Sequence, residues 1–314
     1  MSPCVRTTAG DVAPADLGRV DYHEHLFQVS PLLPGDDLDD EAASTAEASL
    51  LRQSGFDTMV DATPIGLGRD PRALSRAAAA SGLHVVATTG AHRREHYADQ
   101  GWVTALDEPS LTARLLADVM TGMPVLDGPR PSAATNVRAG VLKVGIGYWS
   151  IDAFARRVVA ALAEVHRQTG APVMVHTELA TAAHEILDLL DGLGVAADRV
   201  VLAHVDRNPD PGLHAELASR GAYLGYDGPA RARSAPDSVL LACLAEVAHR
   251  GHVERVVLGG DVARAGRYAS YGGMPGLAYL GRRFVPRLVA EVGEEVADTV
   301  LRANPQRWLT FTPA

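Results

Sequence analysis

Short apolar runs rich in β-branched residues alternate along the chain with longer segments rich in Ala, Leu and Arg. Eight of the runs have the length and composition of buried strands, whereas the segments between them space their apolar residues as an amphipathic helix does. The clearest helical segment is 151–169, which reads IDAFARRVVAALAEVHRQT. The predicted strands span residues 19–25, 58–63, 84–90, 139–146, 172–178, 200–206, 222–228 and 256–262.

This alternation of strand and helix predicts an α/β fold, a (β/α)₈ TIM barrel that occupies residues 1–314 as one domain. An open doubly wound sheet is the alternative, and it normally carries a Gly-rich phosphate-binding loop after its first strand. Here the first strand runs instead into His23-Glu24-His25. The pattern therefore favours the barrel.

Three long connections follow predicted strands, at 27–40, 89–110 and 259–284. In a barrel such loops overhang the catalytic face. Segment 285–301 is predicted to be a closing helix that ends at Asn304-Pro305.

Metal-ligating residue types recur where strands end. His23 and His25 are two apart on a strand and therefore point to the same face. His176 and His204 each close an apolar strand, and Asp261 likewise closes the last one. Each alone has an ordinary explanation, such as a hydrogen-bonded core histidine or a helix cap. Because the carboxyl ends of barrel strands share one mouth, we predict a joint site for Zn²⁺, Mn²⁺ or Co²⁺.

Lys143 lies in AGVLKVGI, an otherwise apolar strand. A buried ammonium costs several kcal/mol unless it is paired or neutralised. Addition of carbon dioxide would convert the amine to a carbamate, an anionic ligand with two oxygens that can bridge two cations. A salt-bridged lysine or a Schiff-base former is the alternative.

The other histidines provide a comparison. Those in predicted helices are expected to be exposed, one begins a strand at the opposite rim, and two fall in a loop. In that order they are His166, His184, His214, His249 and His252, then His84, then His92 and His96. Four histidines, and no others, are thus predicted at the carboxyl ends of strands.

Composition narrows the class of protein. A net charge of −9 argues against a nucleic-acid-binding surface, and the basic cluster at 231–233 is too short to change this. Two cysteines make no disulfide framework, and the N-terminus lacks the apolar run of a signal peptide. No apolar stretch is long enough for a membrane span. We therefore expect a cytoplasmic enzyme with a small-molecule substrate and no nucleic-acid or membrane partner.

The order HxH, Lys, His, His and Asp along strands one, four, five, six and eight resembles that of the phosphotriesterase family of the amidohydrolase superfamily. The flanking segments VDATPIGLGRD, LAHVDRNPD, GAYLGYDG and YGGMPGLAYLGRRFVPRL are similar to those of phosphotriesterase-related proteins and lactonases. The resemblance spans nearly the whole chain, and it implies a binuclear metal-dependent hydrolase that forms a homodimer.

The resemblance also implies a division of ligands between two divalent cations, Zn²⁺ first and Mn²⁺ or Co²⁺ as alternatives. His23, His25 and Asp261 would hold the more buried cation, and His176 and His204 the more exposed one. Carboxylated Lys143 and a hydroxide would bridge the two. Asp261 would then accept the proton of the nucleophile, which makes Asp261 and Lys143 the predicted catalytic residues.

The loops depart from the family pattern. Many lactonase-like members carry an aromatic-Tyr pair after strand three, where this chain has Ala91-His92. His92 and Tyr97 are the candidates to replace the missing tyrosine, and Tyr226 and Asp227 at the end of strand seven are predicted to shape the pocket.

Arginines in the loops after strands seven and eight suit an anionic substrate group such as a carboxylate or phosphate. The candidates are Arg231, Arg264 and Arg267. The alternative is that these side chains pair with local acids or face water.

Polar loops and an aromatic content of 5% suit a lactone, ester or amide better than a bulky phosphotriester. The predicted function is therefore hydrolysis of a carbonyl compound by a metal-bridging hydroxide, with phosphotriester hydrolysis as the alternative. Three further hypotheses stay open: a one-metal deaminase, a non-catalytic barrel that binds a small anion, and a Schiff-base aldolase using Lys143.

Overall fold

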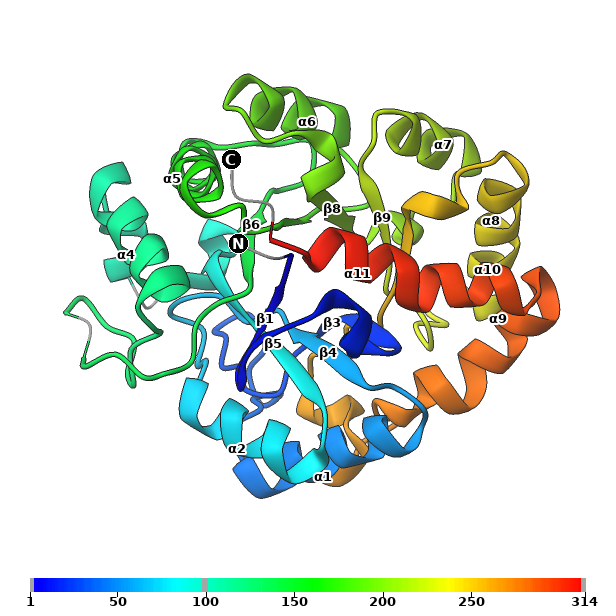
Figure 1. Ribbon diagram of the computed structural model, residues 1–314, viewed down its shortest axis with the longest axis horizontal. Coiled ribbons are helices and arrows are strands. Elements are labelled where there is room, and N and C mark those ends of the chain that lie inside the picture. Colours follow the sequence, from blue (N-terminus) through cyan, green and yellow to red (C-terminus); the bar gives the residue numbers. More distant parts are fainter. Residues whose placement is uncertain (1–2, 98–100, 131, 312–314) are drawn as a thin grey trace.

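Eight parallel strands form one sheet in chain order, and helices surround it (Figure 1). The computed structural model describes residues 3–97, 101–130 and 132–311. The strands of this sheet are β3 (Val20–Glu24), β4 (Thr58–Asp61), β5 (His84–Ala91), β6 (Val141–Gly145), β7 (Val173–His176), β8 (Val200–Ala203), β9 (Tyr223–Tyr226) and β10 (Val256–Leu258). All eight predicted strands are present, and the predicted barrel is confirmed.

The edges of the sheet meet where the site lies. Beyond the paired part of β10, the backbone N–H of Asp261 donates to the carbonyl of His23 over 2.8 Å, which joins the last strand to the first. All but one of the strands are shorter than predicted; β10, for example, stops at Leu258, whereas β5 extends one residue further than predicted, to Ala91. His25, His204 and Asp261 lie beyond the ends of their strands, whereas His23, Lys143 and His176 lie within theirs.

The core has two layers, as expected for a filled barrel. Inward-facing side chains such as Val141 and Met174 form one cluster inside the strands. Leu142 and Val144 belong to the larger cluster between strands and helices. Lys143 alternates with these two and therefore points into the barrel.

The helices occupy the predicted connections. They are α1 (Glu41–Gln53), α2 (Pro71–Ser81), α3 (Gly101–Ala105), α4 (Glu108–Met120), α5 (Ala153–Thr169), α6 (Ala183–Gly192), α7 (Pro211–Ser219), α8 (Asp237–His249), α9 (Val285–Val292), α10 (Glu294–Asp298) and α11 (Asn304–Leu309). The helix predicted at 151–169 is α5, capped by Asp152 and ended by Gly170 at φ 72°. Within the described ranges, none of the helices has the length and apolarity that crossing a membrane requires.

The closing helix differs from the prediction. Gly293 at φ 85° separates α9 from α10, and a π-helical turn, Thr299–Ala303, leads into α11. Pro305 lies in the first turn of α11, where a missing N–H costs no hydrogen bond. Asn304-Pro305 therefore begins a helix, and the prediction that it ends one is wrong.

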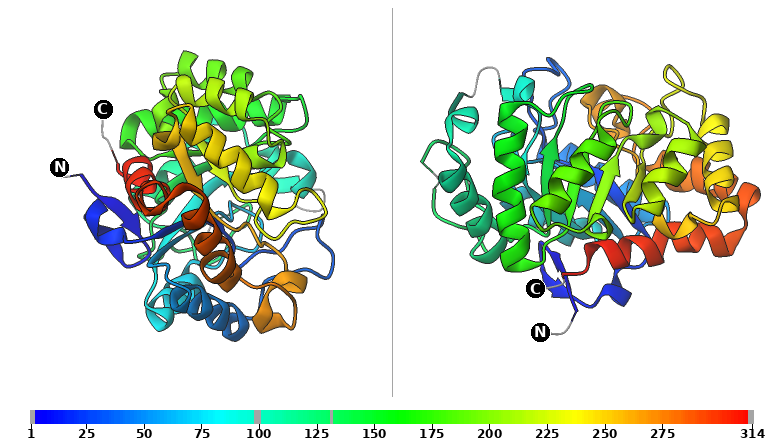
Figure 2. Two further views of the ribbon diagram at one scale, coloured as in Figure 1. Left: turned by 90° about the vertical axis from the view of Figure 1, so that its right-hand side faces the viewer. Right: turned by 90° about the horizontal axis from the view of Figure 1, so that it is seen from above.

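A small hairpin, β1 (Val5–Thr7) with β2 (Gly10–Val12), precedes the barrel and was not predicted. Thr8 N donates to the carbonyl of Val85 near the start of β5, so the hairpin lies at the amino ends of the strands. The view from above in Figure 2 shows the hairpin and α11 at the same end of the barrel.

Candidate metal centre

A cavity of about 340 Å³ opens at the carboxyl ends of the strands. It is lined by His23, His25, Gln28, Leu32, Leu33, His92, Arg93, His96, Lys143, His176, Glu178, His204, Arg207, Arg231, Asp261, Ala263 and Arg264. The fold thus brings all six residues predicted as metal ligands to one place.

Three of them converge from the seam between β3 and β10. Ligand atoms of His23, His25 and Asp261 lie within 4.8 Å of one another. Oδ1 of Asp261 is 3.7 Å from Nε2 of each histidine. Nε2 of His23 is buried and has no hydrogen-bond partner among the described residues, although a buried polar atom is rarely left unsatisfied.

Two more ligand candidates face each other from β7 and β8. Nε2 of His204 is 2.8 Å from Nδ1 of His176. Burial lowers the pKa of His176 well below its usual value and that of His204 to about 4, so both imidazoles are neutral at pH 7. Neutral imidazole is the form that binds a metal.

The backbone is strained at two of these positions. His204 has φ 67° and Asp261 φ 41°, both in the left-handed region. Such a conformation costs on the order of 1–3 kcal/mol for a residue with a Cβ, and it is found mainly where surrounding contacts enforce it.

Outer partners orient the histidines. Asp227 reaches Nδ1 of His204 with Oδ1 (2.6 Å) and Nδ1 of His23 with Oδ2 (3.1 Å). The hydroxyl of Thr63 lies 2.8 Å from Nδ1 of His25. In each ring the Nδ1 edge is held, so Nε2 is left for the cavity. Asp227 is thus a positioning residue behind the cavity rather than the pocket-shaping residue that was predicted.

Asp227 also has the charge state that this role needs. Burial raises the pKa of its carboxyl, but the His204 and His23 rings lower it further, so the net pKa is well below the usual range. The buried hydroxyl of Tyr22 donates a further hydrogen bond to Oδ2.

Lys143, the only lysine in the sequence, is 1% exposed. Its Nζ donates to the carbonyl of Ala62 over 2.8 Å, and it forms no ion pair with any described residue. Burial lowers its pKa to about 8, so a fraction of the amine is neutral near pH 7. Gly90 opposite it is required, because a Cβ there would lie 1.9 Å from the carbonyl oxygen of Lys143.

These donors fit divalent cations. Imidazole nitrogens and a carboxylate are the ligand types that Zn²⁺, Mn²⁺ and Co²⁺ share. The unsatisfied Nε2 of His23 is explained if the site holds a cation.

Two arginines close over Asp261. Arg207 and Arg231 each place Nη2 on its Oδ2, over 2.7 and 2.6 Å. Burial raises the pKa of Asp261, but Arg231 and His23 lower it further, so the carboxyl stays ionised. Arg207 was not predicted, although it lies three residues after His204, at the same mouth.

The other predicted arginines differ in position. Arg264 lines the cavity with 48% of its side chain exposed, and its ion pair with Asp36 is long, at 3.5 Å. Arg267 instead directs Nη1 to the carbonyls of Asp261 and Val262, at 3.4 and 3.3 Å. It braces the loop that carries Asp261.

The aromatic side chains that were predicted to contact the substrate lie in different places. His92 lines the cavity, whereas Tyr97 lies behind it and its hydroxyl accepts the backbone N–H of His92 over 2.8 Å. Tyr226 belongs to the outer apolar layer, with its hydroxyl 2.7 Å from Nδ1 of His214. The structure therefore gives Tyr97 and Tyr226 supporting places, not places on the cavity surface.

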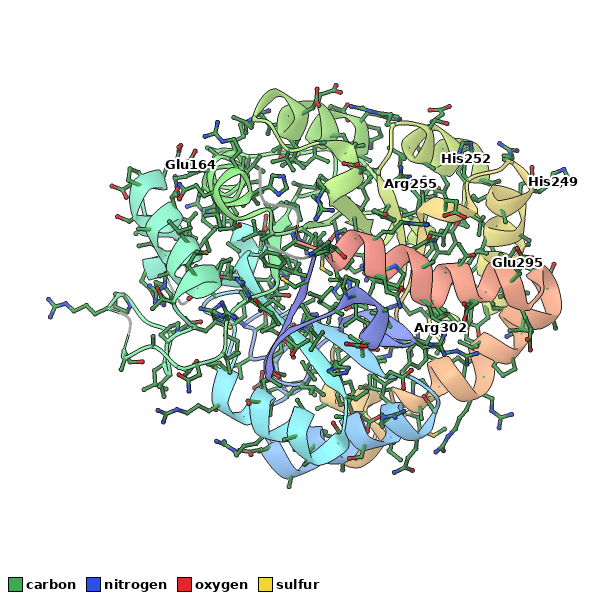
Figure 3. The ribbon with its side chains drawn as sticks, in the orientation of Figure 1. Glu164, His249, His252, Arg255, Glu295 and Arg302 are labelled. Carbon is green, nitrogen blue, oxygen red and sulfur yellow. The ribbon has the colours of Figure 1, made fainter. Side chains whose placement is uncertain are left out.

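Two expectations about the remaining histidines were wrong. His92 directly follows β5, so the strand-end set is larger than four. His214 and His166 are buried, and a ring nitrogen of each is satisfied by a backbone carbonyl, of Val205 and Ala171 respectively. His249 and His252, labelled in Figure 3, lie at the periphery as expected.

Comparison with known proteins agrees with this geometry. The model of the phosphotriesterase family matches residues 3–309. A phospho-furanose lactonase of Mycoplasmopsis synoviae is 29% identical over 98% of this chain and 91% of that protein. An N-acetyltaurine hydrolase of Danio rerio is 28% identical over 98% of both.

A solved lactonase from Listeria monocytogenes superposes with a TM-score of 0.87 at 29% identity, over 98% of this chain and 99% of the other. The family match extends over nearly the whole chain, and these three relatives are named as lactonases or as a hydrolase. The chain is a hydrolytic enzyme that belongs to the phosphotriesterase family.

Proposed function

We propose that the protein is a binuclear metal-dependent hydrolase that opens a lactone, ester or amide carbonyl in a small anionic substrate. The observation that carries this is the convergence of four histidines, Asp261 and Lys143, which forms no ion pair with a described residue, beneath a mouth lined by arginines. His23, His25 and Asp261 would hold one cation, His176 and His204 the other, with Zn²⁺ the first candidate.

Lys143 would supply the bridging ligand. The lone pair of its neutral Nζ adds to the carbon of carbon dioxide, and the nitrogen then loses one proton to water. The product is a carbamate with two oxygens that share one negative charge. A pKa of about 8 keeps enough neutral amine for this reaction near pH 7.

Bound cations would lower the pKa of a water and polarise the carbonyl that it attacks. Asp261 accepts the proton of that water at Oδ1, because Arg207 and Arg231 already hold Oδ2. Asp227 holds the rings of His23 and His204 in the same orientation during the reaction through its contacts with their Nδ1 atoms.

The arginines favour an anionic substrate. Arg264 lies at the mouth with 48% of its side chain exposed, and its one ion pair among the described residues, to Asp36, is long at 3.5 Å, so its guanidinium could take an oxyanion. The names of two relatives, phospho-furanose lactonase and N-acetyltaurine hydrolase, denote substrates that carry a phosphate and a sulfonate. Both support a carbonyl substrate with an oxyacid group.

Metal removal tests the proposal. We expect close to two divalent ions per chain by elemental analysis, hydrolysis of phosphorylated lactones or N-acyl amino-sulfonates, and loss of that activity on chelation with recovery on Zn²⁺ addition. Full activity after chelation would contradict metal dependence. Turnover of phosphotriesters alone would favour the alternative substrate class.

Replacing Arg264 tests the anion site. With Arg264→Gln, KM for a phosphorylated lactone is expected to rise about 10- to 100-fold, since one charge-assisted hydrogen bond contributes about 1.5–3 kcal/mol. KM for the unphosphorylated lactone should not change. Arg233→Gln, which removes an exposed arginine from the loop after β9, is the matched control. Equal effects on both substrates would contradict the assignment.

A further inference from the structure

His92 lies on the wall of the cavity, and neighbouring residues hold it in place. It follows the last residue of β5, lines the cavity and is 8% exposed. Its backbone N–H is held by the hydroxyl of Tyr97 over 2.8 Å. The metal-ligand arrangement proposed above leaves this side chain without a role.

One edge of the ring is fixed by the backbone. The N–H of Arg93 donates to Nδ1 of His92 over 2.7 Å. A ring nitrogen that accepts an N–H carries no proton, so His92 is neutral and its single proton is on Nε2. This tautomer follows from geometry and needs no charged neighbour.

The same edge is packed against β6. A Cβ added at Gly145 would lie 3.0 Å from Nδ1 of His92 and 2.6 Å from the backbone nitrogen of Arg93. Nδ1 therefore faces the strand, and Nε2, across the ring, faces the cavity. Nε2 has no hydrogen-bond partner in the described part of the chain.

Two rings hold the plane of His92. The His96 ring contacts it with centroids 3.8 Å apart and planes tilted by 39°, and the centroid of the His176 ring is 4.4 Å away. His96 is itself held by the hydroxyl of Ser30 at 2.9 Å from Nδ1. The ring can neither flip nor swing without breaking these contacts.

We propose that His92 is a catalytic residue that donates a hydrogen bond from Nε2 to the carbonyl oxygen of the substrate as negative charge develops on it. This inference rests on the proposed hydrolysis of a carbonyl. The position beside His176 places the donor next to the more exposed part of the centre. A neutral imidazole suits this task, because it stabilises an oxyanion without giving up its proton.

The tautomer is tested without any assay of turnover. Long-range ¹⁵N–¹H correlation spectra of histidine-labelled, Zn²⁺-loaded protein, assigned with the His92→Phe variant, should show one His92 proton, on Nε2. Adding acetate as a probe for a product carboxylate should shift that proton downfield. A proton on Nδ1, or on both nitrogens, at pH 7 overturns the proposal whatever the substrate proves to be.

Kinetics provides the second test. His92→Phe keeps a ring in contact with His96 and His176 but removes the donor, and it is expected to lower kcat about 100-fold with KM changed less than about threefold. His92→Gln, whose amide can donate from a similar place, should recover at least about tenfold of that loss. Metal content should equal that of the unchanged protein.

His84→Phe, the same substitution at the opposite end of β5, is the matched control and should not affect kcat. A loss of metal from His92→Phe, or a rise in KM alone, would mean a structural or binding role and overturn the proposal. If the unchanged protein turns over no carbonyl substrate, the proposed function fails, and the spectra still decide the state of His92.

Discussion

Replacing Lys143 with Met is expected to abolish hydrolysis and, at the same time, to stabilise the metal-free protein. Removing a residue that only hydrogen-bonds to a metal ligand already lowers metal affinity or activity about 10–100-fold. Loss of a ligand shared by both cations should therefore lower kcat by at least about 10³-fold, and elemental analysis should find less than two ions per chain.

The stability effect has the opposite sign. Burial lowers the pKa of Lys143 from 10.5 to about 8, so the ionised amine disfavours folding below pH 8. Because a tenfold change in a protonation equilibrium corresponds to about 1.4 kcal/mol, removing the amine should stabilise the metal-free protein by about 3 kcal/mol at pH 7. The gain should shrink as pH rises from 8 to 10.5, because the amine of the unfolded chain then loses its proton as well and folding no longer has to neutralise a charge. Thermal unfolding in carbonate-free buffer measures it.

Lys143→Arg is the matched comparison, since a guanidinium keeps the charge but forms no carbamate under these conditions. It should be as inactive as the Met variant without its added stability. Because the chain has a single lysine, ¹³CO₂ should give one lysine carbamate resonance, absent from both variants. Activity retained by Lys143→Arg would show that no carbamate is needed.

Asp227→Asn is expected to weaken both halves of the centre. One carboxylate holds Nδ1 of His23 and of His204, which belong to different predicted cation sites. An amide cannot accept from both rings, so affinity for each cation should fall about 10- to 100-fold, and kcat at limiting metal should fall with it. Metal titration followed by calorimetry measures both sites.

Asp118→Asn provides the control, because Asp118 is equally buried but bonds Arg69 and Thr89, away from the centre. It should lower stability without changing metal affinity. Weakening of one site alone by Asp227→Asn would contradict the shared role of this carboxylate.

The parts of the molecule that repeat could be predicted from the sequence. Strands β7, β8 and β10 are apolar runs because both of their faces are buried, and the polar residue that follows each run at its carboxyl end lies at the mouth. His176, His204 and Asp261 share that place, so a local pattern was enough to bring them together.

Features that depend on contacts between distant segments could not be predicted. Burial of His214 depends on Tyr226 and on the carbonyl of Val205, and nothing in the helical pattern of α7 shows this. The hydrogen bond from Arg207 to Asp261 forms only because the barrel brings together the ends of β8 and β10, which are far apart in the sequence. The hairpin β1–β2 has three-residue strands, too short for a periodic signal.

The two ends of the described chain meet at the amino ends of the strands. Phe311 N donates to the carbonyl of Cys4 over 2.9 Å, and Figure 2 shows both ends on the side that carries the hairpin and α11. A surface anchor or fused reporter attached at either end would therefore sit behind the barrel. Immobilised in this way, the enzyme would present its mouth to the solution, and a linker of a few residues between Cys4 and Phe311 would allow new ends to be opened in a loop elsewhere.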